Sequence, residues 1–301
     1  MIQFVIGLLA PARAFVVGLV LVLSVPALAA NENNNGPALW VIENGPSTVH
    51  LFGSMHLLKP DARWRTARLD DIINNADHLV MEIKLDPEGQ AAIQRFMAEN
   101  GMFPPGQSLK DSLPDDLYKD LIKESANLGL PETVINRMRP WYAALVLSMG
   151  MIQRLGFDPR QGVEHVIATK AANANIKVSG LETPREQLST MAGQSPKVQE
   201  AMVRDSLRQL HEMGEKLDDL TAAWTKGDTA TLEELLIGGF EELPELYEAV
   251  LVERNRRWLP RIQALLDEPG RHLVVVGSAH LLGEDSVIAM LRAAGLTVKR
   301  E

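Results

Sequence analysis

The stretch Leu51-Phe-Gly-Ser-Met-His56-Leu-Leu-Lys-Pro-Asp61 recurs near the far end of the chain as Val275-Val-Gly-Ser-Ala-His280-Leu-Leu-Gly-Glu-Asp285. When Gly53 is aligned with Gly277, the glycine, serine, histidine, both leucines and the last aspartate coincide. An internal repeat of this kind indicates two units that are built alike. We therefore expect the fold to be organised around two G-x-x-H motifs.

An apolar, β-prone run precedes each motif, over 49–52 in the first case and over 273–276 in the second. A strand that ends at a glycine and is followed by a histidine places that histidine at its carboxyl end. In open α/β sheets, ligands bind outside this edge. We therefore predict that His56 and His280 share one site.

The apolar residues after the first motif have helical spacing over 69–76, and Asp61 is a plausible N-cap. A buried strand is predicted next, over 79–83. Strand, helix and strand form a βαβ unit, which is right-handed and parallel in nearly all known cases. A further strand over 38–42 is expected to pair with the strand at 49–52.

The rest of the chain extends this pattern. Helical stretches are predicted over about 87–155, 161–172, 195–267 and 287–294, with strands at 176–181, 273–276 and 296–298. The predicted fold is α/β, with a mixed, partly parallel sheet built from two βαβ-type halves that carry the G-x-x-H motifs. Helices flank this sheet, and two of the helical stretches are large inserts. No Gly-, Pro- or Ser-rich linker divides residues 38–301, so we predict one domain.

The N-terminus has the features of a secretory signal over residues 1–29. An apolar core spans 15–25, Arg13 precedes it, and Ala27-Leu28-Ala29 is a small-x-small cleavage site. The polar stretch 30–37 is predicted to be flexible. These features predict a periplasmic or secreted protein. An uncleaved membrane anchor is the alternative, because the first residues are unusually apolar.

Composition excludes several classes of function. The chain has 301 residues, a formal net charge of −9, a pI near 5.4 and no cysteine. The acidic balance disfavours nucleic acid and anionic membrane surfaces as partners. The lack of cysteine excludes disulfides, thiolate chemistry and cysteine–zinc sites. Membrane contact is expected only through the N-terminal segment, and the sequence does not determine an oligomeric state.

Three residues are the candidate metal ligands: His56, His280 and Glu82, which falls at the carboxyl end of the strand over 79–83. Two histidines and one carboxylate hold catalytic zinc or non-haem iron in other proteins, with positions left open for water. The alternatives are hydrogen-bonded histidines at strand ends and a solvated carboxylate.

Glu182 ends another predicted strand, so we consider it a fourth ligand or the general base, although a turn before a helix would explain it equally well. Arg254 and Asn255 are candidates for stabilising an oxyanion, with a charged helix face as the alternative. Glu164 and His165 are weaker candidates.

Other motifs are absent, and other histidines carry no repeated context. Neither Gly53-Ser54 nor Gly277-Ser278 is a nucleophile elbow, because the second glycine of G-x-S-x-G is missing. No glycine-rich phosphate loop occurs. The remaining histidines are interpreted as structural or surface residues, namely His50, His78, His211 and His272.

Taken together, the motifs resemble the TraB/GumN family, which is distantly similar to the Tiki metalloproteases and to the erythromycin-esterase/ChaN-like group. The resemblance covers nearly all of the chain after residue 29. Beside the paired G-x-x-H motifs and Glu82, it rests on Met138-Arg-Pro-Trp141, Gly162-Val-Glu164, Leu181-Glu-Thr183 with Gln187, Trp224-x-x-Gly227-Asp228 and Glu253-Arg-Asn255.

The resemblance implies a mixed sheet flanked by helices, with both histidines and the glutamate at a metal centre. The Tiki relatives are divalent-metal-dependent peptidases. The family more often has aspartate at the position of Glu164, so a direct role for that residue is not implied.

Two functions from different classes follow. The first is an exported metal-dependent hydrolase that acts on peptides or another small substrate, with Mn²⁺, Co²⁺ or Zn²⁺ as cofactor. The second is a protein that binds a peptide, haem or metal without turnover, or an accessory factor in envelope polysaccharide biosynthesis. A degenerate, purely structural relative is a third interpretation, which the presence of His56, Glu82 and His280 disfavours.

Overall fold

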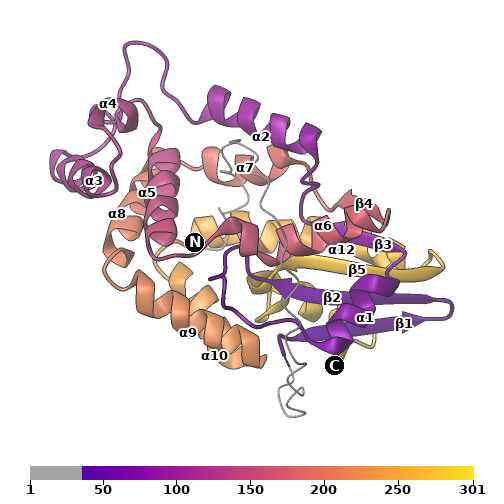
Figure 1. Ribbon diagram of the computed structural model, residues 1–301. Coiled ribbons are helices and arrows are strands. Elements are labelled where there is room, and N and C mark those ends of the chain that lie inside the picture. Colours follow the sequence, from indigo (N-terminus) through magenta and orange to yellow (C-terminus); the bar gives the residue numbers. More distant parts are fainter. Residues whose placement is uncertain (1–35) are drawn as a thin grey trace, which may run out of the picture.

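The computed structural model describes residues 36–301 of the chain (Figure 1). The predicted signal segment, 1–29, and most of the polar stretch 30–37 lie outside the described residues. The described chain begins with Gly36 and Pro37, which are both buried. Within residues 36–301, no helix is both long enough and apolar enough to cross a bilayer.

A six-stranded sheet forms the centre of the fold, in the order β4-β3-β5-β2-β1-β6. The strands are β1 (Leu39–Asn44), β2 (Ser47–Ser54), β3 (His78–Met81), β4 (Lys177–Gly180), β5 (Gly270–Gly277) and β6 (Lys299–Arg300). Strands β2 to β5 run parallel, whereas β1 pairs antiparallel with β2 and with β6. The predicted mixed, partly parallel α/β sheet is confirmed.

The two repeated motifs lie on neighbouring strands. Strand β5 inserts between β2 and β3, and Ser54 is the register partner of Gly277. The backbones pass so closely that a Cβ on Gly53 would lie 3.0 Å from Ser278 Oγ. The Ser278 hydroxyl donates to the carbonyl of Ser54 over 2.9 Å. Residues far apart in sequence are therefore brought together by a buried parallel pair, as the apolar runs predict.

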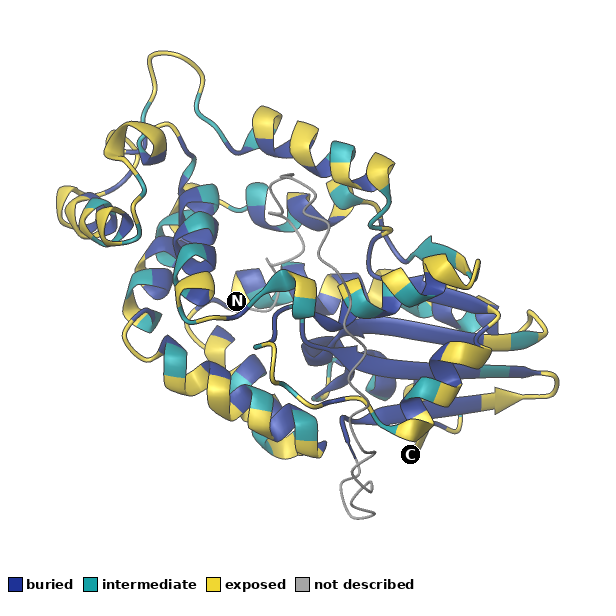
Figure 2. Ribbon diagram, in the orientation of Figure 1, coloured by how far each residue is buried: buried dark blue, intermediate teal, exposed yellow. Residues whose placement is uncertain are grey.

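Helices cover both faces of the sheet. In Figure 1, α1 (Ala67–Asn75) and α6 (Val163–Asn173) lie in front of it and α12 (Glu253–Leu265) lies behind. Helix α13 (Val287–Ala293) packs against α12. Figure 2 shows that β2, β3 and β5 are buried along most of their length, whereas α1 and α6 expose their outer faces.

The two helical inserts gather beyond the ends of β2 and β5 (Figure 1). The first contains α2 (Pro87–Asn100), α3 (Asp115–Asn127), α4 (Glu132–Ile135) and α5 (Pro140–Arg154). The second contains α7 (Pro184–Ala192), α8 (Pro196–Gln209), α9 (Met213–Lys226), α10 (Thr229–Ile237) and α11 (Pro244–Tyr247), and a π-helical segment (Glu248–Val252) leads into α12. Helices α5 and α8 pack together and join the inserts.

Two local predictions are wrong. Helix α1 is capped by Thr66, whose hydroxyl accepts from the N–H of Leu69 over 3.1 Å, and not by Asp61. The chain between them is a loop, so Asp61 is too far from the first helical turn to satisfy its N–H groups. The last strand is Lys299–Arg300 rather than 296–298, because the edge of β1 pairs at these residues, Trp40 with Arg300 and Val41 with Lys299.

Candidate functional site

The predicted site residues follow the carboxyl ends of four parallel strands, which we call the carboxyl edge. His56 lies just after β2, Glu82 directly after β3 and Glu182 just after β4. His280 lies in a short 3-10 turn, Ser278–Leu281, that follows β5. Because these strands run in one direction, their ends meet at one edge of the sheet.

Both histidines and Glu82 lie around Gly277. A Cβ on Gly277 would lie 3.2 Å from Glu82 Oε1, 3.5 Å from His56 Nε2 and 3.8 Å from His280 Cδ2. The lack of a side chain at Gly277 therefore leaves a small space between three potential metal ligands. We call this space and its three side chains the Gly277 site.

His280 is held with its Nε2 facing Glu82. Its Nδ1 donates to Asn255 Oδ1 over 2.5 Å, and the Asn255 amide in turn donates to the carbonyl of Asp285 over 2.8 Å. The ring packs on Trp258 at a centroid distance of 4.3 Å, and Nε2 lies 3.9 Å from Glu82 Oε1. Burial, assisted by nearby Arg254, keeps the pKa of His280 well below its usual value. His280 is therefore neutral, with its lone pair on Nε2.

His56 has the same orientation with a different partner. Its Nδ1 lies 2.6 Å from Glu164 Oε1, which also accepts a hydrogen bond from the Ser54 hydroxyl. Burial opposes the charged imidazolium, but Glu164 raises the pKa of His56 to about 9. Nδ1 therefore keeps its proton and Nε2 is directed to the Gly277 site. A metal ion bound at Nε2 would replace the second proton.

Glu82 is held ionised by three donors. Gln187 Nε2 donates to Oε2 over 2.8 Å, Arg254 Nη2 donates to the same oxygen over 2.7 Å, and the N–H of Gly277 donates to Oε1 over 2.7 Å. Burial alone would raise the pKa of Glu82, but Arg254 is the largest of the influences that lower it, to about 2. The site thus contains a buried carboxylate whose Oε1 lies 3.9 Å from His280 Nε2.

Arg254 is fully buried and joins the whole network. Its Nε donates to Glu182 over 2.8 Å and its Nη1 contacts His280 Nε2 over 3.1 Å and the carbonyl of Val250 over 3.0 Å. A buried charge is tolerated when it is paired and hydrogen-bonded. Arg254 therefore supplies a buried positive charge that is shared between Glu82 and Glu182.

The sequence-predicted catalytic residues are all present at this edge, with contacts that bear on their roles. Both oxygens of Glu182 accept from Arg254, and burial raises the pKa of Glu182. Asn255 uses its amide oxygen for His280 and its amide nitrogen for Asp285. These contacts are those of positioning residues, and the base and oxyanion roles stay predictions.

The donor set suits a divalent cation. Each histidine has its Nδ1 next to an oxygen, which is the usual arrangement of metal-ligating histidines, and His280 Nε2 lies 3.9 Å from Glu82 Oε1. The contact between Arg254 and His280 Nε2 would have to be replaced by the ion. Arg254 also donates to Oε2 of Glu82. This ion pair would remain if the contact between Arg254 and His280 were lost.

His56 and Glu164 are the less buried side chains of the site. Their side chains are 14% and 12% exposed, whereas those of Arg254 and His280 are 0% and 1% exposed. The part of the network formed by Arg254 and His280 is therefore shielded from water.

Several residues of the site were not predicted to act there. Glu164, a weaker candidate by sequence, contacts His56 Nδ1, and Ser54 and Gln187 donate to Glu164 and to Glu82, respectively. The signal for Glu164 was its place in the first turn of an amphipathic helix that begins at Gly162. A Cβ on Gly162 would lie 2.0 Å from the carbonyl oxygen of His56. Glycine at this position therefore allows α6 to begin directly beside the loop that carries His56.

Comparison with known proteins places the chain in a family. The sequence profile of the TraB/PrgY/gumN family matches residues 38–300. The uncharacterized Escherichia coli protein YbaP is 25% identical over 256 residues, which cover 85% of this chain and 92% of YbaP. A protein named "Metalloprotease TIKI homolog" from Amphimedon queenslandica is 22% identical over 330 residues, covering 90% of this chain and 62% of that protein. No solved structure matches.

The chain belongs to the TraB/PrgY/gumN family, because the match extends over nearly all the residues that the structure describes. The resemblance read from the G-x-x-H motifs is confirmed.

Proposed function

We propose that this protein is an exported, metal-dependent hydrolase that cleaves peptide-like bonds at the Gly277 site. The observation that carries the proposal is the convergence of His56 Nε2, His280 and Glu82 Oε1 on the space beside Gly277. The similarity to a protein named as a metalloprotease supports the same class of reaction. Export rests on the predicted N-terminal signal segment.

Three side chains would hold the cation: His56 and His280 through Nε2, and Glu82 through Oε1. Mn²⁺, Co²⁺ or Zn²⁺ each accept such a set of ligands. When bound, the ion would supply Lewis acidity toward a substrate carbonyl and a water molecule. This is chemistry that no side chain at the site provides alone.

The protein prepares this site before any ligand arrives. Glu164 and Asn255 fix the tautomers of the two histidines, and Arg254 keeps Glu82 ionised. Preorganised ligands and charges reduce the reorganisation that a reaction requires. Because Arg254 and His280 are shielded from water, we infer that a substrate binds on the side of His56 and Glu164. Glu182 as base and Arg254 with Asn255 at an oxyanion remain the assigned roles to be tested.

The direct test is turnover of a mixed fluorogenic peptide pool by the purified protein with Mn²⁺, Co²⁺ or Zn²⁺. We expect cleavage that EDTA abolishes and that falls at least about 100-fold in Glu82→Gln, because removal of a metal ligand removes the Lewis acid. His211→Gln is the matched control, since His211 is exposed and outside the site. Cleavage that persists in EDTA, or unchanged in Glu82→Gln, would contradict the proposal.

A binding function is the second candidate, because both oxygens of Glu182, the assigned base, accept hydrogen bonds from Arg254. Saturable peptide or haem binding by the same protein, with no cleavage in any metal, would identify it as a binding or accessory protein. Glu182→Gln separates the roles further: loss of turnover with retained metal uptake is expected of a base.

A further inference from the structure

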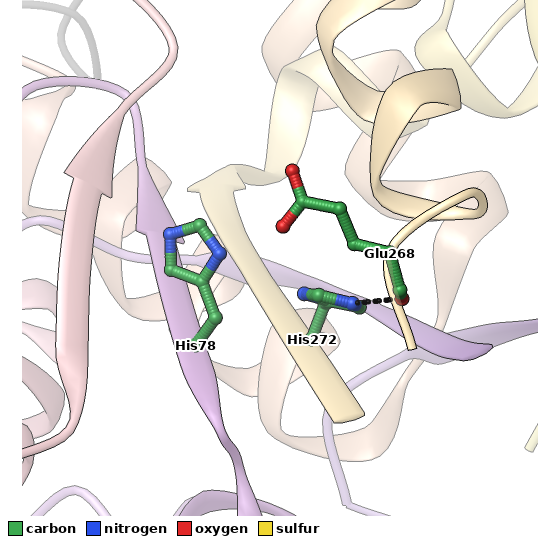
Figure 3. A group of neighbouring side chains, drawn as sticks. All are labelled: His78, Glu268 and His272. Atoms are coloured by element: carbon green, nitrogen blue, oxygen red, sulfur yellow. Dashed lines mark hydrogen bonds between the residues drawn. The ribbon is translucent and has the colours of Figure 1, made fainter. Parts of the chain in front are cut away.

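A second group of metal-ligating side chains lies at the opposite end of the sheet, at the amino ends of β3 and β5. His78 is the first residue of β3, and it is the register partner of His272 on β5. Glu268 lies between the end of α12 and the start of β5. Figure 3 shows the two rings and the Glu268 carboxylate turned toward one another. We call these three residues the amino-edge group.

The donor atoms of this group are close enough for one ion after a small adjustment. One ligand atom from each residue lies within 4.8 Å of the others. Two atoms bonded to a tetrahedral zinc ion at about 2.1 Å lie about 3.4 Å apart. His78 and His272 are fixed on neighbouring strands, whereas the Glu268 side chain is exposed. Rotation of Glu268 can therefore shorten the distances from its carboxylate to both imidazoles.

Each histidine already has its outer nitrogen held. His272 Nε2 donates to the backbone carbonyl of Glu268 over 2.9 Å, so that in the neutral ring the lone pair is on Nδ1. His78 Nε2 lies 2.8 Å from the hydroxyl of Ser179 on β4. Metal-ligating histidines are usually oriented by such a bond from the second ring nitrogen.

The inner nitrogens have no partner within the described chain. Nδ1 of His78 and Nδ1 of His272 are both buried without a hydrogen bond to any residue in 36–301. The residues are only 6% and 3% exposed. A buried polar atom that lacks a partner is costly, and an ion is one of the partners that removes this cost. Figure 3 shows both Nδ1 atoms on the side of the ring that faces the carboxylate.

From this geometry we propose that His78, His272 and Glu268 bind one transition-metal ion of the Zn²⁺ class at the amino edge. Two imidazoles and one carboxylate suit Zn²⁺, Co²⁺ or Ni²⁺, whereas Mg²⁺ and Ca²⁺ prefer oxygen ligands throughout. The ion would tie the α12–β5 connection to β3 and leave a coordination position open to solvent. The proposal is independent of the hydrolase assignment, because it shares no residue with the Gly277 site.

The test is metal binding by the full chain, with Zn²⁺ or Co²⁺ alone as the probe. Stoichiometry is measured by calorimetry and elemental analysis, and Co²⁺ coordination by visible absorption. In a His56→Gln/His280→Gln protein, which lacks the Gly277 ligands, we expect one bound ion per chain. Glu268→Gln in the same background should weaken this binding at least about tenfold, and His272→Gln should abolish it.

His50→Gln is the matched control. His50 is a buried histidine on neighbouring β2 whose Nε2 also lacks a hydrogen bond within residues 36–301, but it is not part of the group. His50→Gln should leave the binding unchanged.

If His272→Gln does not fold, Glu268→Gln decides the matter, because that side chain is exposed. If the double variant does not fold, wild type and Glu268→Gln are compared directly, and one of the bound ions should bind at least about tenfold more weakly in Glu268→Gln. No metal uptake attributable to this group, or uptake equal in wild type and Glu268→Gln, would overturn the proposal.

Discussion

Histidine and glutamate side chains lie at both ends of the parallel strands, but the two groups differ in whether their polar atoms have hydrogen-bond partners. At the carboxyl edge, a buried guanidinium lies between two carboxylates, and each histidine donates its Nδ1 proton to an oxygen. At the amino edge, two buried imidazoles keep a nitrogen without a partner in the described chain. The first edge is stabilised by charges of its own, whereas the second offers ligands that its own chain does not use.

This difference indicates what an added ion would do at each edge. At the carboxyl edge, an ion competes with Arg254 for His280 and with a proton for His56, so this competition lowers the free energy gained on binding the ion. At the amino edge, it would satisfy two orphaned nitrogens, so it would add stability and no reaction. The predictions below test this contrast.

Arg254→Met should have the largest effect. It leaves Glu82 and Glu182 buried without their counter-charge, and breaking a buried ion pair costs about 3–5 kcal/mol in the free energy of unfolding. Urea denaturation measures this loss. Arg256→Ala, an exposed neighbour on the same helix, is the control and should change stability by less than about 0.5 kcal/mol. Equal effects of both variants would show that the network is not buried as described.

Gly277→Ala should abolish most activity while the protein stays folded. The methyl group would lie 3.2 Å from Glu82 Oε1 and 3.5 Å from His56 Nε2, in the space where the ion is proposed to bind. A misplacement of this order lowers turnover about 100-fold. Gly239→Ala is the matched control, because a Cβ there meets nothing within 4 Å. Turnover and circular dichroism are measured together, and wild-type turnover in Gly277→Ala would refute the location.

Glu164→Gln should weaken metal affinity at the Gly277 site by about 10- to 100-fold, because it removes the negative charge that orients His56. Calorimetric titration with Mn²⁺ or Co²⁺ measures the change. Glu200→Gln, on the surface of α8, should bind as the wild type does. An unaltered affinity in Glu164→Gln would mean that His56 does not ligate the ion.

The smallest effect is expected at the amino edge. In the His56→Gln/His280→Gln background, Zn²⁺ at ten times the dissociation constant of the amino-edge group should stabilise the protein by about 1.4 kcal/mol, which raises Tm by about 3–6 °C. Adding Glu268→Gln to this background should remove most of the increase, and Glu268→Gln alone should leave peptide turnover unchanged. Thermal unfolding with and without Zn²⁺ provides the measurement. A loss of turnover in this variant would show that the two edges are coupled.

Much of the fold could be predicted from local pattern. The apolar runs before Gly53 and Gly277 and the helical spacing over 69–76 reflect which side chains must be buried, and burial follows a period that is visible in the sequence. Helix caps and edge strands were less predictable. The N-cap of α1 is Thr66 and not Asp61, because the Thr66 hydroxyl accepts from the first helical turn. The last strand is Lys299–Arg300 and not 296–298, because these residues pair with β1.

The amino-edge group could not be predicted. His78 and His272 have no repeated context and were interpreted as structural or surface residues, and Glu268 belongs to a connection without a motif. They meet only because β5 inserts between β2 and β3 in a register that pairs His78 with His272. Register depends on long-range strand pairing, which leaves no local signal.

The sequence by itself determined the family, the α/β class and the pairing of two G-x-x-H motifs, because a repeated strand-and-histidine pattern is a local property of the chain. The tertiary structure alone decided that Arg254 pairs with both Glu82 and Glu182, that Glu164 holds His56, and that two further histidines face each other at the opposite edge. Hydrogen bonds and ion pairs act over a few ångströms, and only the folded chain brings residues so distant in sequence within that range.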